Sequence, residues 1–128
     1  MQFRSALAKL AQLTTLTILT TFTLFAQNVN TTYRSKISYP GQTLANVWGY
    51  TSGGKEYALV GGSQGLIIVD ITNPDSPNQI VQIPGPNNLW KEIKTYQHYA
   101  YVTSEGGGGI QVVDLAGLPS PILTLKQV

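Results

Sequence analysis

The fold is decided by the stretch Gly65-Leu66-Ile67-Ile68-Val69-Asp70-Ile71. A near copy, Gly109-Ile110-Gln111-Val112-Val113-Asp114-Leu115, follows 44 positions later. Both copies are rich in β-branched residues and begin after a glycine-containing loop, which is typical of β-strands. The nearly continuous apolar run 66–69 is the pattern of a strand that is buried on both faces, as happens where sheets stack. The sequence therefore predicts a repeated, layered all-β fold.

The repeat extends outward from these two strands. Trp48 precedes Tyr57 by nine positions and Trp90 precedes Tyr99 by nine, so both pairs are 42 positions apart. Repeats of about 40 to 45 residues that are built from short strands are typical of β-propeller blades. The pattern therefore predicts two consecutive blades in which Trp48 and Trp90 occupy equivalent positions.

Turn residues divide each repeat into four expected strands of an antiparallel sheet. The domain boundaries that follow are a signal peptide at 1–26, a lead-in segment at 27–44, a first blade at 45–86 and a truncated second blade at 87–128. Because propellers contain about four to eight blades, we expect the chain to be part of a longer protein with an incomplete propeller. Assembly of several short chains into one ring is the alternative. The expected strands are 45–50, 56–61, 66–71 and 79–83, followed by 89–96, 99–104, 110–115 and 122–126.

The first 26 residues have the layout of a secretory signal. Arg4 and Lys9 form the charged start, an apolar stretch follows at 10–25, and Ala26 is a small residue at the expected cleavage position. An uncleaved membrane anchor and a buried helix are the alternatives. Six threonines interrupt the apolar stretch, which falls short of the roughly 20 apolar residues needed to span a bilayer. We therefore predict export, a mature N-terminus at Gln27 and no transmembrane anchor in this chain.

Composition argues against a nucleic-acid partner. The net charge is +2, from eight basic and six acidic residues. Arg4 and Lys9 lie in the expected signal peptide, so that the remainder carries six charges of each sign and lacks a basic stripe. The chain contains no cysteine, which excludes a disulfide framework and a thiolate metal site.

Three motifs favour turns over catalysis or ligand binding. Gly61-Gly62-Ser63-Gln64-Gly65 fits the serine-hydrolase pattern G-x-S-x-G, but that elbow must lead into a helix and here a strand is expected to follow. The glycine run 106–109 lacks the helix that strengthens a phosphate loop. Asp70, Asn73 and Asp75 are better explained as turn-capping side chains than as calcium ligands. We accordingly predict no catalytic residue, metal or cofactor.

Five residues near the starts of the two repeats are the candidate binding residues. The first strand of a blade borders the central channel, although packing between blades also explains the tryptophan rings. Alternation along the strand places Trp90 and Glu92 on one face and Lys91 on the other. Glu92 is then expected either to reach water at the channel mouth or to pair with Lys91 or Lys94 at the surface. The five residues are Asn46, Trp48, Trp90, Lys91 and Glu92.

Four segments stand out in the two repeats: Ala45-Asn46-Val47-Trp48-Gly49-Tyr50, Glu56-Tyr57-Ala58-Leu59-Val60-Gly61, Leu89-Trp90-Lys91-Glu92-Ile93-Lys94 and His98-Tyr99-Ala100-Tyr101-Val102. Together they resemble the start of the choice-of-anchor B proteins, whose blades are of the LVIVD repeat type. The resemblance implies an exported bacterial protein with propeller blades that is retained at the cell surface by a C-terminal sorting signal. Members often carry an acidic residue after the first asparagine and Arg-Asp in the later motif, where this chain has Val47, Lys91 and Glu92.

The leading functional hypothesis is a non-catalytic surface or secreted propeller that binds a protein or glycan, since rigid stacked sheets present loops and no catalytic constellation is evident. One alternative is an enzyme with a metal or acid/base site over the central channel, completed by further blades. Another is a purely structural repeat of the cell envelope.

Overall fold

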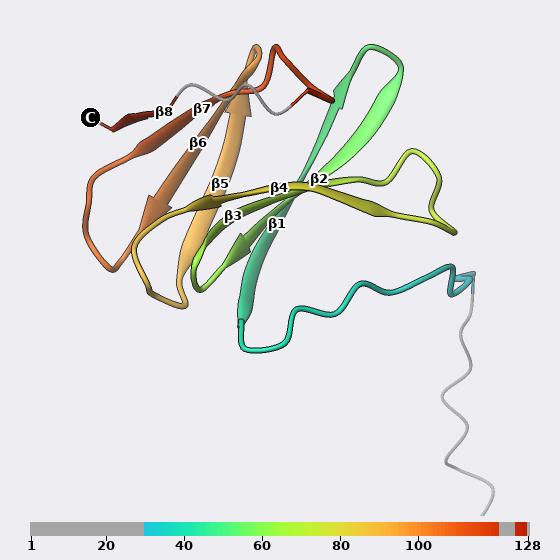
Figure 1. Ribbon diagram of the computed structural model, residues 1–128, viewed down its shortest axis with the longest axis horizontal. Helices are drawn as coiled ribbons and strands as arrows, with labels where there is room; N and C mark the ends of the chain where they lie inside the picture. The colour runs from blue at the N-terminus through green and yellow to red at the C-terminus, as the bar shows by residue number, and fades with distance from the viewer. Residues whose placement is uncertain (1–29, 121–124, 128) are drawn as a thin grey trace, which may run out of the picture. The chain divides into compact units, whose positions relative to one another are not determined.

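The computed structural model of this 128-residue chain describes residues 30–120 and 125–127 (Figure 1). All the strands lie in the compact unit Arg34–Val128. The residues described form strands, turns and bends, without a helix among them and hence without any long apolar helix suited to crossing a membrane. The expected signal peptide at 1–26 and the start of the expected last strand at 122–124 lie outside the described residues.

The strands form two antiparallel sheets in which neighbours in sequence are neighbours in space. The first sheet has the order β1-β2-β3-β4 and the second the order β5-β6-β7-β8. The predicted all-β class with two four-stranded antiparallel sheets is confirmed. The strands are β1 Leu44–Ser52, β2 Lys55–Gly62, β3 Gly65–Asp70, β4 Asn78–Pro84, β5 Lys91–Tyr96, β6 Tyr99–Ser104, β7 Gln111–Asp114 and β8 Leu125–Gln127.

Local sequence explains the tight connections between the first two strands of each sheet. Gly53 and Gly54 form the two-residue turn between Ser52 and Lys55, and both have positive φ angles, 57° and 75°. Hairpin turns of this length favour positive φ, which glycine adopts without a steric penalty. In the second sheet Gln97 takes a φ of 55° in the two-residue turn before β6.

The hydrophobic core lies between the two sheets. Strand β3 is buried on both faces, because Leu66 and Ile68 point to one side, Ile67 and Val69 to the other, and all four are at most 4% exposed. Burial of each such side chain stabilises the fold by about 1.5–3 kcal/mol. The core residues are Tyr57, Leu59, Leu66, Ile68 and Ile83 from the first sheet, with Ile93, Ala100, Val102, Val113 and Leu115 from the second sheet and its flanking turn.

The lead-in segment, expected at 27–44, is fastened to the first sheet at both of its described ends. Arg34 donates from Nε and Nη2 to the carboxylate of Asp75, at 2.8 and 2.6 Å. Near the other end, the side-chain amides of Gln42 and Gln82 donate to each other at 3.0 and 3.2 Å. These contacts connect the segment to the β3–β4 turn and to β4, so that it enters β1 from a fixed position.

Several strand boundaries differ from those expected. Two boundaries differ by two residues, since β1 ends at Ser52 rather than at residue 50 and β5 begins at Lys91 rather than at residue 89. The backbone N–H of Trp90 donates to Asn88 Oδ1 at 2.7 Å. Because this local side-chain bond engages the N–H of Trp90, that group does not join the β5–β6 ladder. β7 covers 111–114 rather than 110–115, and β3 ends at Asp70 rather than at residue 71.

The expected equivalence of Trp48 and Trp90 is wrong. Trp48 lies inside β1 opposite Leu59. In the second sheet Tyr101 occupies the position that corresponds to Leu59, and the residue opposite Tyr101 is Lys94 rather than Trp90. Trp90 lies before β5, and its carbonyl accepts the N–H of Glu105 at 3.3 Å. The hairpin explains the shift: the β1–β2 pairing continues past Tyr50↔Tyr57 to Ser52↔Lys55, whereas β5–β6 closes at Tyr96↔Tyr99. Equivalent residues of the first strands, β1 and β5, are therefore 46 positions apart, whereas equivalent residues of the second strands, β2 and β6, are 42 positions apart.

Asp70 at the end of β3 gives the fold a testable pH dependence. Hydrogen bonds from Thr72 and then Lys55 lower the pKa of Asp70 from 3.8 to about 2. Since the folded pKa is the lower one, this stabilisation is present above about pH 4 and is lost as the pH falls toward 2. We expect Asp70→Asn to reduce the slope of unfolding free energy against pH over that interval, as measured by urea denaturation. Equal slopes in the variant and the parent chain would contradict this.

Candidate functional site

Two of the predicted site residues, Asn46 and Glu92, meet where β1 passes β5. Asn46 Nδ2 donates to Glu92 Oε2 at 3.1 Å. They are structural counterparts, because Asn46 lies opposite Gly61 in the first sheet and Glu92 lies opposite Thr103 in the second. The Asn46 Oδ1 atom is buried and accepts no hydrogen bond from the residues described. The contact joins the first strands of the two sheets through a carboxylate that remains 55% exposed.

Trp48 also connects β1 to β5. Its indole Nε1 donates to Thr95 Oγ1 at 2.9 Å. The ammonium of Lys94 lies 4.1 Å from the centroid of the Trp48 ring and 2.7 Å from Glu92 Oε1. A cation over an indole face is attracted by the ring quadrupole, so Trp48, Lys94 and Glu92 form one connected surface cluster. Glu92 thus pairs with Lys94 at the surface, which was one of its two expected environments.

Lys91 points to the opposite side of β5 and is only 5% exposed. Its ammonium donates to the backbone carbonyls of Pro86 and Asn88, each at 2.8 Å, and to that of Ser63 at 3.4 Å. Burial lowers the pKa of Lys91 below its ordinary value of 10.5. These carbonyls belong to the β4–β5 connection and to the β2–β3 turn, so Lys91 fastens both segments to β5.

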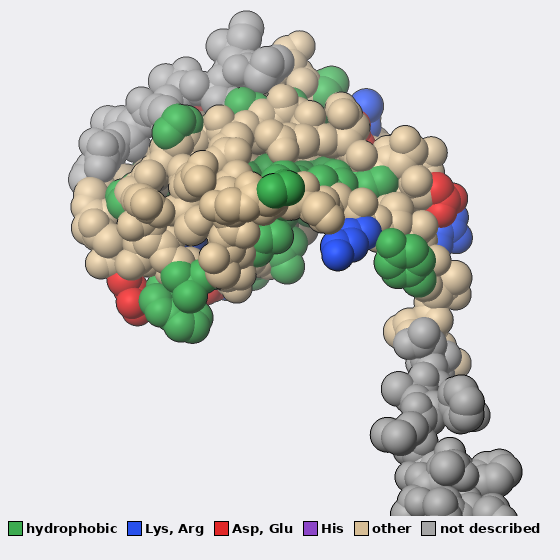
Figure 2. All heavy atoms as spheres, turned by 60° about the horizontal axis from the view of Figure 1, so that its bottom comes forward, with side chains coloured by type: hydrophobic (Ala, Val, Ile, Leu, Met, Phe, Trp, Pro, Cys, Tyr) green, Lys and Arg blue, Asp and Glu red, His purple; other side chains and the backbone are tan. Residues whose placement is uncertain are grey.

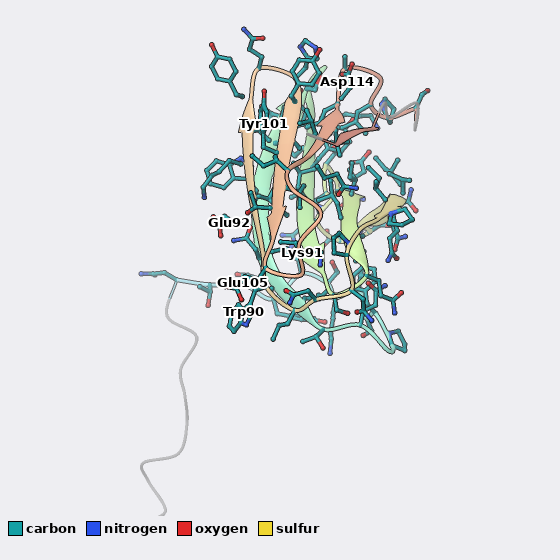
Figure 3. All side chains as sticks on the ribbon, turned by 90° about the vertical axis from the view of Figure 1, so that its left-hand side faces the viewer. Trp90, Lys91, Glu92, Tyr101, Glu105 and Asp114 are labelled. Atoms are coloured by element: carbon teal, nitrogen blue, oxygen red, sulfur yellow. The ribbon has the colours of Figure 1, made fainter. Side chains whose placement is uncertain are left out.

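Trp90 and two glutamates surround a cavity at the start of β5, which we call the Trp90 pocket. Its volume is about 360 Å³, and Trp90 is 59% exposed. Figure 3 shows Trp90, Glu105 and Glu92 grouped on one side of the β5–β6 pair, with Lys91 directed to the other side. The pocket is lined by Trp90, Lys91, Glu92, Thr103, Ser104 and Glu105.

Strand register explains why these side chains share a face. Glu92 lies opposite Thr103 in the β5–β6 ladder. One step beyond Lys91↔Ser104, the hydrogen bond between the Glu105 N–H and the Trp90 carbonyl places Glu105 opposite Trp90. Alternate residues of paired strands project on the same side, so an indole, two carboxylates and a threonine hydroxyl meet at the pocket.

Glu105 and Thr103 were missed in the sequence analysis. Trp90 had been aligned with Trp48, which placed it inside a strand and hid its pairing with Glu105. A register based on the tight Gln97-His98 turn would have found it, since counting back from Tyr96↔Tyr99 puts residue 90 opposite residue 105. Composition gives no such signal, because a glutamate beside a glycine loop is commonly a solvated turn residue.

The other motifs occupy turns. Ser63 lies between β2 and β3, and Gly65 leads directly into a strand rather than a helix, as the strand interpretation of G-x-S-x-G predicts. Asp70 Oδ1 accepts the N–H of Thr72 at 3.0 Å, and Asn73 Oδ1 accepts that of Asp75 at 3.1 Å. These are the expected turn-capping bonds. Within the described part of the chain, no group of three or more His, Cys, Asp or Glu residues is positioned to hold a metal ion.

Comparison with known proteins gives one match. Residues 52–83 match the family model described as the LVIVD repeat. This range runs from the last residue of β1 through β2 and β3 into β4. No curated protein and no solved structure matches the chain. The first sheet of this chain therefore contains an LVIVD repeat, which suggests a β-propeller repeat protein.

Proposed function

We propose that this chain is an exported β-propeller repeat protein of the choice-of-anchor B kind, and that it acts at the cell surface or after secretion as a non-catalytic binding module. In this proposal the chain is part of a longer protein, and its partner is a surface protein or a glycan. The observation that carries the binding role is the Trp90 pocket, in which a tryptophan that is 59% exposed lies beside a cavity of about 360 Å³. Large exposed aromatic rings next to concave surfaces are characteristic of binding sites.

The fold supports this role because it holds the pocket rigidly. The Trp90 backbone is fixed by the Asn88 side chain on one side and by Glu105 on the other. Lys91, the next residue, is tied to three carbonyls. An aromatic side chain presented by such a fixed backbone loses little conformational entropy on binding. The export part of the proposal is tested by N-terminal sequencing of protein secreted from a host cell, with Gln27 as the expected first residue and a retained Met1 as the contrary result.

The binding role is tested by replacing the indole. We expect Trp90→Ala to abolish binding to any peptide or oligosaccharide that an immobilised panel of both classes selects with the parent chain. Because the ring is largely exposed, the unfolding free energy should change by less than about 1 kcal/mol. Tyr96→Ala is the matched control, since Tyr96 is 68% exposed on the same sheet but outside the pocket. Binding that survives Trp90→Ala, or that both variants weaken equally, would overturn the assignment.

A further inference from the structure

The charges at the Trp90 pocket are mainly negative. Lys91 lines the cavity, but its ammonium is turned into the protein and donates to three backbone carbonyls. Glu92 shares its carboxylate with Asn46 and Lys94. Within the part of the chain that the structure describes, the Glu105 carboxylate has neither an ion pair nor a hydrogen bond. The pocket therefore presents a partly neutralised carboxylate, an unpaired one and no free cationic group from the lining residues.

The combination is specific to the second sheet. Ser63 N–H donates to the Thr43 carbonyl at 2.8 Å, as Glu105 N–H donates to that of Trp90 at 3.3 Å. Thr43 and Ser63 are thus the counterparts of Trp90 and Glu105 in the first sheet. Since the first sheet forms the same strand pairing with two small hydroxyl residues, neither the indole nor the carboxylate is required by the scaffold.

An exposed indole face beside a carboxylate is complementary to an organic cation. The ring quadrupole attracts an ammonium or guanidinium group, and the carboxylate pairs with it. The aliphatic stem of a lysine or arginine covers apolar surface while its charged head reaches a polar partner. In Figure 2, which turns the lower edge of Figure 1 forward, hydrophobic side chains project at the lower left with acidic side chains beside them.

We propose that the Trp90 pocket binds a lysine or arginine side chain of a partner protein, with the stem on the Trp90 ring and the cationic head at Glu105. This inference rests on the proposed binding function and names its ligand class. A lysine or arginine side chain fits better than a sugar because its cationic head only donates hydrogen bonds. Sugar hydroxyls also need donors, and the cationic and backbone donors of the pocket, which are the Lys91 ammonium and the backbone N–H groups of Trp90 and Glu105, are engaged within the chain.

The experiment uses the full chain and small probes that differ in one charge. Nα-acetyl-lysine amide is compared with Nα-acetyl-norleucine amide, and glucosamine with N-acetylglucosamine, by following the Trp90 indole N–H signal in NMR titrations. The indole signal is assigned by its loss in Trp90→Phe. We expect only the lysine probe to shift it strongly, with Glu105→Gln weakening the lysine affinity about fivefold to tenfold. Glu56→Gln is the matched control, because Glu56 is an exposed carboxylate on β2 of the other sheet.

Each contrary outcome identifies what fails. Equal affinity for the lysine and norleucine probes, or equal weakening by Glu105→Gln and Glu56→Gln, would overturn recognition of a cation at this pocket. A stronger shift with glucosamine than with lysine would assign the pocket to an amino sugar and overturn the protein ligand. If neutral panel ligands bind in a Trp90-dependent way while the lysine probe does not, the proposed function stands and this inference falls. If no probe and no panel ligand depends on Trp90, both fall.

Discussion

Replacing Gly65 with alanine is expected to destabilise the chain by at least about 3 kcal/mol. Gly65 opens β3 with a φ of +139°, a conformation that side-chain-bearing residues rarely adopt. A Cβ atom there would overlap the carbonyl oxygen of Ile83 and lie 2.8 Å from the backbone N of Gly85. Both are backbone atoms beside the Gly65↔Pro84 pair, so relief requires the start of the β3–β4 pairing to open. Urea denaturation of the variant measures the loss.

Gly49→Ala is the control for this prediction. Gly49 lies in β1 without a positive φ, and a Cβ added there meets nothing within 4 Å. We expect its unfolding free energy to change by less than about 1 kcal/mol, with a gain where alanine reduces the freedom of the unfolded chain. Equal effects of the two substitutions would mean that the contact at Gly65 relaxes without cost.

Gly65→Ala should also disturb the Trp90 pocket. The turn that ends at Gly65 holds the β4–β5 connection, because Gly85 N–H donates to the Gln64 carbonyl at 3.1 Å and Asn88 N–H to that of Ser63 at 3.0 Å. Asn88 in turn fixes the backbone of Trp90. A shift at Gly65 therefore reaches the pocket through the connection, and we expect weaker ligand binding even at temperatures where the variant remains folded.

The strand framework could be predicted because its signals are local. Each signal depends on a few adjacent residues. The signals are the β-branched runs, the glycine and proline turns, and the duplicated stretch at 65–71 and 109–115. β6 has the expected limits of 99–104, and the expected burial of β3 on both faces is confirmed. Hairpin length was not predictable in the same way. The β1–β2 pairing continues from Tyr50↔Tyr57 to Ser52↔Lys55, but the residues of this extension have the composition of a loop, so that only the register shows that they are paired.

That difference in register decided how much of the candidate site could be predicted. The contact between Asn46 and Glu92 brings two of the predicted residues together, and the opposite orientations of Lys91 and Glu92 follow from strand alternation. The roles of Trp48 and Trp90 diverge, however, since one ring packs over β5 and the other stands at a cavity. A repeat in sequence implies similar pairing, but a cross-strand neighbour such as Glu105 is set by the register of each hairpin.

Lys91→Met is expected to destabilise the chain by about 2–4 kcal/mol. Methionine keeps an unbranched apolar stem in the space beside Gly61 and Gly85, which lie close to Lys91 Cβ and Cε. It removes the ammonium from the carbonyls of Pro86 and Asn88. Hydrogen bonds to a charged group contribute about 1.5–3 kcal/mol each, and part of this is offset because burial of the ammonium is itself unfavourable.

Lys94→Met is the control, because the Lys94 side chain is 57% exposed and pairs with Glu92 at the surface. We expect it to change the unfolding free energy by no more than about 1 kcal/mol. Urea denaturation of both variants checks this contrast, and the NMR signal of the Trp90 indole N–H reports whether Trp90 moves when its neighbour loses its carbonyl contacts. A Lys91→Met variant as stable as the parent chain would show that desolvation of the ammonium cancels its three bonds. In that case the position of the β4–β5 connection, and with it the Trp90 pocket, would depend on the β2–β3 turn rather than on Lys91.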